Sequence, residues 1–238
     1  MWFALALVVV AGCGRVHFDV DGGGGAPTYY AVSGDGVSPT DLLTLDLETA
    51  HATVVGTIPA SLGILGGLAY WDANTLYATS TGRVVAITLS PFSAVVTRMI
   101  AGTYSSLERD GAQLLGIDQD AETIASFDPN GSGNVVGRQL GLDAYGGDLT
   151  RRGGVWYWYA NPTNQLYIVS ATADPVPFGA PSPSVPFVAG IVSDDTGRMF
   201  FITDGTDELI EIDASSGQPI GSMIVDHDLK SGDMTRSP

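Results

Sequence analysis

Short apolar strands separated by turn residues recur along this chain at a nearly constant spacing. The clearest copy spans 66–80, where GGLAYWDANTLYATS encodes a strand, a turn and a second strand. Weaker copies begin near Ser106, Gly147, Gly190 and Gly232, so successive copies lie about 40 residues apart. Short β-branched and aromatic runs recur, and no stretch after residue 20 keeps a helical period. The pattern predicts an all-β repeat protein.

The two ends of the chain carry complementary parts of one repeat. The last copy stops after its first strand, at 231–236, and the first copy begins with its second strand, at 28–33. A period of about 40 residues is that of β-propeller blades. We therefore predict a β-propeller of five four-stranded blades, closed by pairing of 230–236 with 28–33, which removes free sheet edges. A truncated larger propeller and a split β-sandwich are the alternatives.

Within the repeats, strand pairs flank short turns, and a third, outer strand such as 94–100 follows. The segment 67–89 carries a Gly-Leu-Ala strand, a turn, a hydrophobic-Tyr strand and a hydrophobic strand, and it resembles the NHL and YVTN-type propeller repeats. The resemblance covers about 28–238 and implies that the Gly-Leu-Ala strand is innermost, but it implies no single function. The predicted pairs are 76–80 with 83–89, 114–117 with 123–127, 155–159 with 165–169, and 199–203 with 209–212.

The chain starts with an apolar run, 1–12, that ends in Val10-Ala11-Gly12-Cys13. A run of about 12 residues is too short to span a bilayer but suits a signal peptide. The four residues resemble the lipobox of bacterial lipoproteins, which implies cleavage before Cys13 and lipidation of its thiol. An ordinary secretory signal with a chance cysteine is the alternative. Cys13 is the only cysteine, so the chain has no second cysteine for a disulfide.

The same resemblance implies a location in the bacterial cell envelope. Gly14, not Asp, follows the cysteine, which in the Gram-negative pattern favours the outer over the inner membrane, with the domain periplasmic or surface-exposed. We expect a signal peptide at 1–12, a lipidated cysteine and Gly-rich tether at 13–27, and the propeller at 28–238.

The net charge of −16 arises from 26 acidic and 10 basic residues. Because phosphate backbones need dense Lys and Arg, this charge argues against nucleic-acid binding. It either keeps the domain soluble or attracts a cationic partner. We expect a monomer that binds an unidentified protein or small molecule.

Two aspartates are candidate site residues because they occupy matched positions. The segments 147–151 (GDLTR) and 232–236 (GDMTR) differ at one of five positions, and other blades have Leu68 or Ile191 instead. Asp148 and Asp233 are therefore predicted to face one channel mouth. There they could bind a ligand or Ca²⁺, or act as acid and base in glycoside cleavage. Alternatively, each accepts backbone N–H bonds and fixes a turn.

Further aspartates fall in loops that a propeller places on one face, which we expect to be acidic. Four of them, Asp204, Asp207, Asp226 and Asp228, are candidate metal ligands, although Asp-Gly is also a common turn dipeptide. The whole set is Asp35, Asp118, Asp120, Asp143, Asp204, Asp207, Asp226 and Asp228.

The densest aromatic run is 155–159 (VWYWY). Strand alternation places Trp156 and Trp158 on one face, and Tyr157 and Tyr159 on the other. Because blades pack face to face, we expect both faces in the core; a sugar-stacking platform is the alternative.

Several enzyme classes find no support in the sequence. It has no Gly-x-Ser-x-Gly elbow, phosphate loop or dinucleotide fingerprint, and His51 and His227 are too few for a His-rich metal site. We predict a lipid-anchored cell-envelope propeller that acts as a binding or protein-interaction module without a cofactor, Ca²⁺ excepted. The alternative is an envelope hydrolase or lyase that uses Asp148 and Asp233.

Replacing Cys13 by Ser should release the protein from the membrane, because the acyl chains that anchor it need the thiol. Fractionation of cells that express the Cys13→Ser and Gly14→Ser variants tests this, and only the first should become soluble. Membrane attachment of the Cys13→Ser variant contradicts the lipobox prediction.

Overall fold

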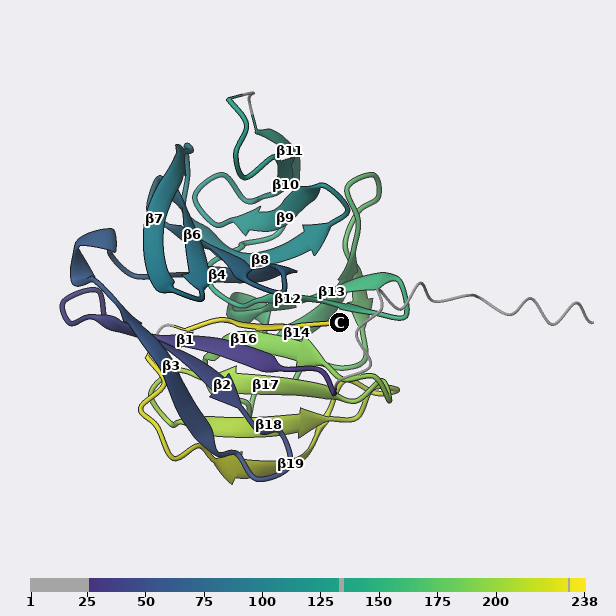
Figure 1. Cartoon of the computed structure of the whole chain (residues 1–238). Coiled ribbons are helices and arrows are strands. Elements are labelled where there is room, and N and C mark those ends of the chain that lie inside the picture. Colours follow the sequence, from purple (N-terminus) through teal and green to yellow (C-terminus); the bar gives the residue numbers. More distant parts are fainter. Residues whose placement is uncertain (1–25, 133–134, 231) are drawn as a thin grey trace, which may run out of the picture.

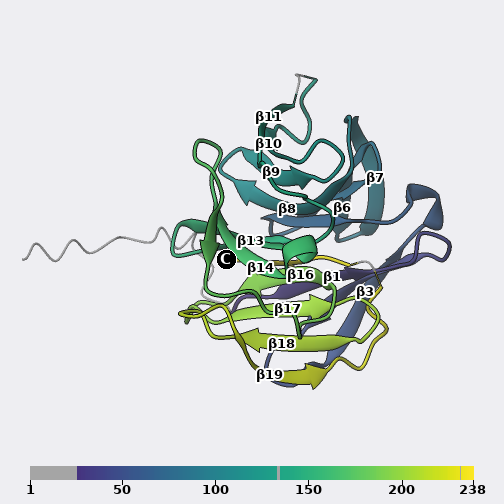
Figure 2. The same ribbon diagram turned by 180° about the vertical axis from the view of Figure 1, so that it is seen from behind.

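The computed structural model describes residues 26–132, 135–230 and 232–238. They form five four-stranded antiparallel sheets arranged as the blades of a ring (Figures 1 and 2). In the described residues there is no α-helix, only the 3₁₀ turns Ala60–Leu62 and Asn161–Thr163. The five-bladed propeller predicted from the repeat is therefore confirmed. The signal peptide, Cys13 and most of the tether lie outside the described residues.

Four blades consist of consecutive strands, and we name each by its innermost strand. Their bounds are β4 (Gly67–Asp72), β5 (Thr75–Ser80), β6 (Arg83–Leu89) and β7 (Phe92–Met99); β8 (Tyr104–Asp110), β9 (Gln113–Asp118), β10 (Thr123–Phe127) and β11 (Val136–Gln139); β12 (Leu149–Arg152), β13 (Val155–Ala160), β14 (Gln165–Val169) and β15 (Val176–Phe178); β16 (Val188–Ser193), β17 (Met199–Thr203), β18 (Glu208–Ile212) and β19 (Pro219–Ile224).

The fifth, closing blade combines both ends of the chain, as Figure 1 shows where the yellow C-terminal strand lies beside β1. Its strands are β20 (Met234–Arg236), β1 (Tyr29–Ser33), β2 (Thr40–Leu45) and β3 (Ala52–Ile58), in that order. β20 pairs antiparallel with β1, and Tyr30 lies opposite Thr235. The predicted pairing of 28–33 with 230–236 is thus correct, and the fold is not a split β-sandwich.

The strand boundaries differ from the predicted ones in a few places. β8 starts at Tyr104, not Ser106, because a β-bulge between them adds a residue to this strand. The outer strand β7 starts at Phe92 and not at Ala94, since Phe92 still pairs with Leu89 across the hairpin. The bulge explains why this copy of the repeat is hard to recognise in the sequence.

The core lies between neighbouring blades and not at the centre of the ring. Trp158 is fully buried on the side of the β8 blade, with Trp156 packed against the same cluster. Tyr157 and Tyr159 pack on the opposite side, against the β16 blade. The aromatic run is therefore core on both faces, as predicted, and it does not form a sugar-stacking platform.

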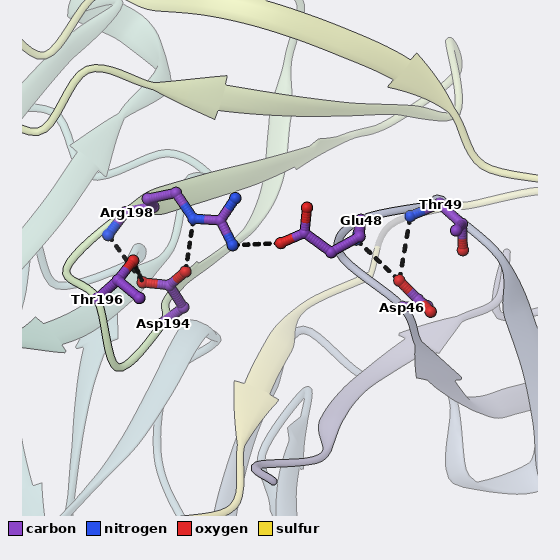
Figure 3. Close-up of polar contacts among 6 residues, drawn as sticks. All are labelled: Asp46, Glu48, Thr49, Asp194, Thr196 and Arg198. Carbon is purple, nitrogen blue, oxygen red and sulfur yellow. Dashed lines mark hydrogen bonds and ion pairs between the residues drawn. The ribbon is translucent and has the colours of Figure 1, made fainter.

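Ion pairs link the closing blade to the β16 blade at the end of the ring opposite the start of the innermost strands. Arg198 binds Asp194 at 2.7 Å and reaches across the blade boundary to Glu48 (Figure 3). In the reverse direction, Arg236 of the closing blade pairs with Asp195. Because these side chains are partly exposed, each pair contributes at most about 1 kcal/mol and mainly fixes how the blades meet.

The described part of the chain includes no helix with the length and apolar character that membrane crossing requires.

Removing 230–238 should destabilise the whole domain, because it takes away the buried side chains of Met234 and Thr235 and exposes the edge of β1. Loss of a buried methionine side chain alone costs about 2–5 kcal/mol, a large part of the total for an ordinary domain. Chemical denaturation should show one transition at much lower denaturant.

A circular permutant is the matched control. The two ends of the propeller are adjacent, since the Ser237 N–H donates to the Thr28 carbonyl at 2.8 Å, so a short linker can join residues 28 and 237. New ends at the Gly153–Gly154 turn would keep β20 paired with β1, and this protein should stay stable. A truncated protein as stable as the full chain contradicts the role assigned to closure.

Candidate functional site: a carboxyl pair at the centre of the ring

Asp148 directly precedes β12 and is fully buried. Its Oδ1 accepts a hydrogen bond from the Leu149 N–H of its own strand at 2.6 Å. Its Oδ2 accepts one from the Ile191 N–H of β16 at 2.7 Å. One carboxyl group thus joins the innermost strands of two neighbouring blades.

Asp233 repeats this arrangement in the closing blade and is also fully buried. Its Oδ1 accepts the Met234 N–H at 2.6 Å, and its Oδ2 accepts the Leu68 N–H of β4 at 2.5 Å. Leu68 and Ile191, which stand in place of the aspartates in the sequence repeat, are therefore the donors that bind them. The carboxylates do accept backbone N–H groups, as the turn interpretation expected, but one of the two bonds that each makes links neighbouring blades.

The two carboxyl groups also meet each other. Asp148 and Asp233 come from blades that are not neighbours, yet they lie within hydrogen-bonding reach across the ring axis. Burial raises the pKa of Asp148 to about 7, and burial together with the Asp148 charge raises the pKa of Asp233 well above its usual value. Since two buried carboxylates in contact repel each other, the pair holds a proton near neutral pH.

A third carboxyl group, missed in the sequence, belongs to the same centre. Glu108 lies on β8 and is half-buried. Burial, followed by the charge of Asp148, raises its pKa to about 8, while Arg236 and Arg151 lower it. The bulge in β8 makes this copy of the repeat hard to align with the others, so Glu108 was not recognised as a site residue. A carboxylate within a predicted innermost strand was the sequence signal that could have identified it.

Three of the four candidate metal ligands, Asp207, Asp226 and Asp228, have carboxylates that are occupied by other contacts. Asp226 pairs with the His51 side chain and accepts the Ala52 N–H at 2.7 Å. Asp228 pairs with Lys230 at 2.7 Å. Asp207 accepts the Leu229 N–H at 2.6 Å, and Asp204 donates its N–H to a loop carbonyl. Among the described residues, no three or more such side chains are grouped so as to hold a metal ion.

The predicted acidic face is only partly realised. Asp35, Asp120, Asp143 and Asp228 are exposed, whereas Asp118 is buried and accepts the Asp120 N–H. Asp226 is also exposed, but its side chain pairs with His51 of the β2–β3 connection. We call this end of the ring the loop face; its connections are 34–39, 59–66, 81–82, 100–103, 119–122, 140–148, 161–164, 179–187, 204–207, 225–230 and 232–233.

The loop face also exposes apolar side chains. Val37 is 85% exposed and Ile64 44%, and both lie in connections next to the closing blade. Tyr145 is 61% exposed and Phe187 41%, and they lie in the connections that enter β12 and β16.

Two grooves lie elsewhere, on the outer part of the ring. One, of about 610 Å³, is lined by Gln113, Phe127 and Arg138 among others. The other, of about 440 Å³, is lined by Tyr29 and residues that include Arg198 of Figure 3. Neither groove includes the central carboxyl groups.

No protein-family model matches the chain, and no curated protein matches it in sequence. Solved structures do share its fold. A protein of unknown function from Bacteroides caccae has 11% identity and a TM-score of 0.55, over 84% of this chain and 73% of that one. A chain in a nidogen/laminin complex has 12% identity and a TM-score of 0.60, over 87% of this chain and 98% of that one. Virginiamycin B lyase from Staphylococcus aureus has 11% identity and a TM-score of 0.51, over 84% of this chain and 74% of that one. At these identities the likeness shows the β-propeller fold alone.

The stability of the domain should fall as pH rises from about 4.5 to about 8. Between these values the folded protein holds protons on Asp148, Asp233 and Glu108 that the unfolded chain has released, so raising the pH favours unfolding. Urea denaturation across this pH range measures the slope.

The Asp148→Asn variant should flatten this slope, because its amide can donate to Asp233 without a shared proton. It should also be less stable by about 1–3 kcal/mol, since one backbone N–H loses its acceptor. The exposed Asp143→Asn is the matched control and should keep the parent slope. An unchanged slope in Asp148→Asn contradicts the protonated pair.

Proposed function

We propose that the chain is a β-propeller binding module that holds a protein partner on its loop face. The observation that carries this proposal is the exposure of Val37, Ile64, Tyr145 and Phe187 on that face, interspersed with unburied carboxylates. Such apolar groups would be covered by a partner, and the polar groups around them would form the rim of the interface.

The charge of the chain supports a basic partner. The net charge is −16, and Asp35, Asp120, Asp143 and Asp228 extend from the loop face into solvent. A Lys- and Arg-rich segment would be steered toward this face, and acidic or anionic partners would be repelled. Lys230, which pairs with Asp228, is a basic residue of the same face.

The alternative is an envelope hydrolase or lyase that uses Asp148 and Asp233. Their contact and shared proton favour it, because convergent carboxyl groups with raised pKa values are typical of acid–base catalysis. Their complete burial and their bonds to four backbone N–H groups favour a structural role. A substrate could reach only Glu108 without displacing those bonds, so we rank binding above catalysis.

We further propose that Cys13 carries a lipid anchor and that the tether holds the monomeric propeller close to the envelope membrane. Gly14 in place of Asp after the cysteine favours the outer membrane. The Gly-rich composition of 13–27 is that of a linker, which would leave the loop face accessible. Ca²⁺ is the ion that the loop carboxylates would suit if a partner completed their coordination.

Neutralising the loop face should weaken binding of a Lys/Arg-rich peptide by about tenfold and reduce its salt dependence, as removal of several rim charges does. The variant combines Asp35→Asn, Asp120→Asn, Asp143→Asn and Asp228→Asn, and calorimetry at two salt concentrations measures binding.

The control removes the same number of exposed carboxylates from the opposite end of the ring, at Asp46, Asp72, Asp110 and Asp128. It should bind nearly as tightly as the parent. Equal weakening in both variants would show attraction by net charge alone and reject the loop face as the binding site.

A further inference from the structure

Tyr145 and Phe187 form an aromatic pair that bridges two blades. Their ring centroids are 6.1 Å apart, and the planes meet at 66°. Both rings are largely exposed, whereas every other ring pair in the described residues includes a buried or half-buried ring. The edge-to-face pair therefore presents apolar surface to solvent, and neither ring belongs to the buried core.

The backbone around both rings is held in place. The Asn161 side chain donates to the Val188 carbonyl at 2.8 Å and accepts the Val188 N–H at 2.9 Å, which fixes the chain next to Phe187. Gly146 has φ +66° and packs under the Phe187 ring, where a Cβ would lie 2.3 Å from the ring. The pair is thus organised before any partner binds, which lowers the entropy lost on binding.

An acidic residue is hydrogen-bonded to the backbone of each ring residue, Asp143 through its carboxylate and Asp204 through its own N–H. Asp143 Oδ1 accepts the Tyr145 N–H at 3.0 Å, and the Asp204 N–H donates to the Phe187 carbonyl at 2.9 Å. The described arginines that lie over rings do so elsewhere, at Phe127, Trp71, Trp156 and Phe200. The chain therefore supplies the aromatic rings of a cation–π site here, and none of the arginine–ring contacts in the described residues uses them.

We infer that Tyr145 and Phe187, with Asp143 and Asp204, receive an arginine or lysine side chain of the partner protein. This inference rests on the proposed function and names the contact that gives the loop face its specificity. A guanidinium can lie against a ring face while the neighbouring carboxylates neutralise its charge, and an exposed cation–π contact gains from that proximity. A neutral sugar would use the rings but carries no positive charge for the carboxylates to neutralise.

The test compares an acetylated, amidated (Arg-Gly)₄ peptide with its citrulline counterpart, which has nearly the same shape and no charge. The Tyr145→Leu/Phe187→Leu variant keeps apolar bulk and removes both π faces. It should bind the arginine peptide about three- to fivefold more weakly by calorimetry, the size of an exposed cation–π contribution. Tyr145→Phe should retain parent affinity, and so should Ile220→Ala, a control at an exposed apolar residue of β19 outside the loop face.

The outcomes separate this inference from the proposed function. If the double leucine variant binds like the parent while the four-carboxylate variant is weakened, the aromatic site is wrong and the loop face stands. If neither variant is weakened, both proposals fail. Equal affinity of the parent for the citrulline and arginine peptides would show an apolar contact and overturn the cation site.

Discussion

The pairing of β20 with β1 is the interaction on which this structure depends. It closes a ring of five sheets with backbone hydrogen bonds between residues about 200 positions apart, and it covers the edge of β1 that would otherwise be unpaired. Asp233 extends that closure, because it directly precedes β20 and accepts the Leu68 N–H of the next blade. Without β20, the closing blade would lose its innermost strand, and only four innermost strands would remain around the centre of the ring.

The centre of the ring is held by carboxyl groups instead of apolar side chains. Asp148 and Asp233 have no access to solvent, so each needs hydrogen bonds in place of water, and four backbone N–H groups supply them. The contact between the two acids is tolerated because a proton remains on the pair. This arrangement ties the β12 and closing blades to the β16 and β4 blades.

Because these carboxyl groups fill the centre of the ring, the loops are the part of the fold that can vary over a fixed scaffold. Proteins with the same fold include a lyase and a chain of a nidogen/laminin complex, so the ring itself does not determine activity. Here the connections that enter β12 and β16 bring Tyr145 and Phe187 together, and neither ring is needed for the core.

The sequence by itself determined the ring, because strand period and the complementary ends of the repeat are local properties that need no knowledge of contacts. It also identified Asp148 and Asp233 from a match between two segments. Tertiary structure decided their burial and contact, the placement of Glu108 beside them, the pairing of Asp226 with His51, and the meeting of Tyr145 with Phe187. The physical reason is that these contacts join different blades. Their geometry depends on how the sheets twist and pack, which no single repeat encodes.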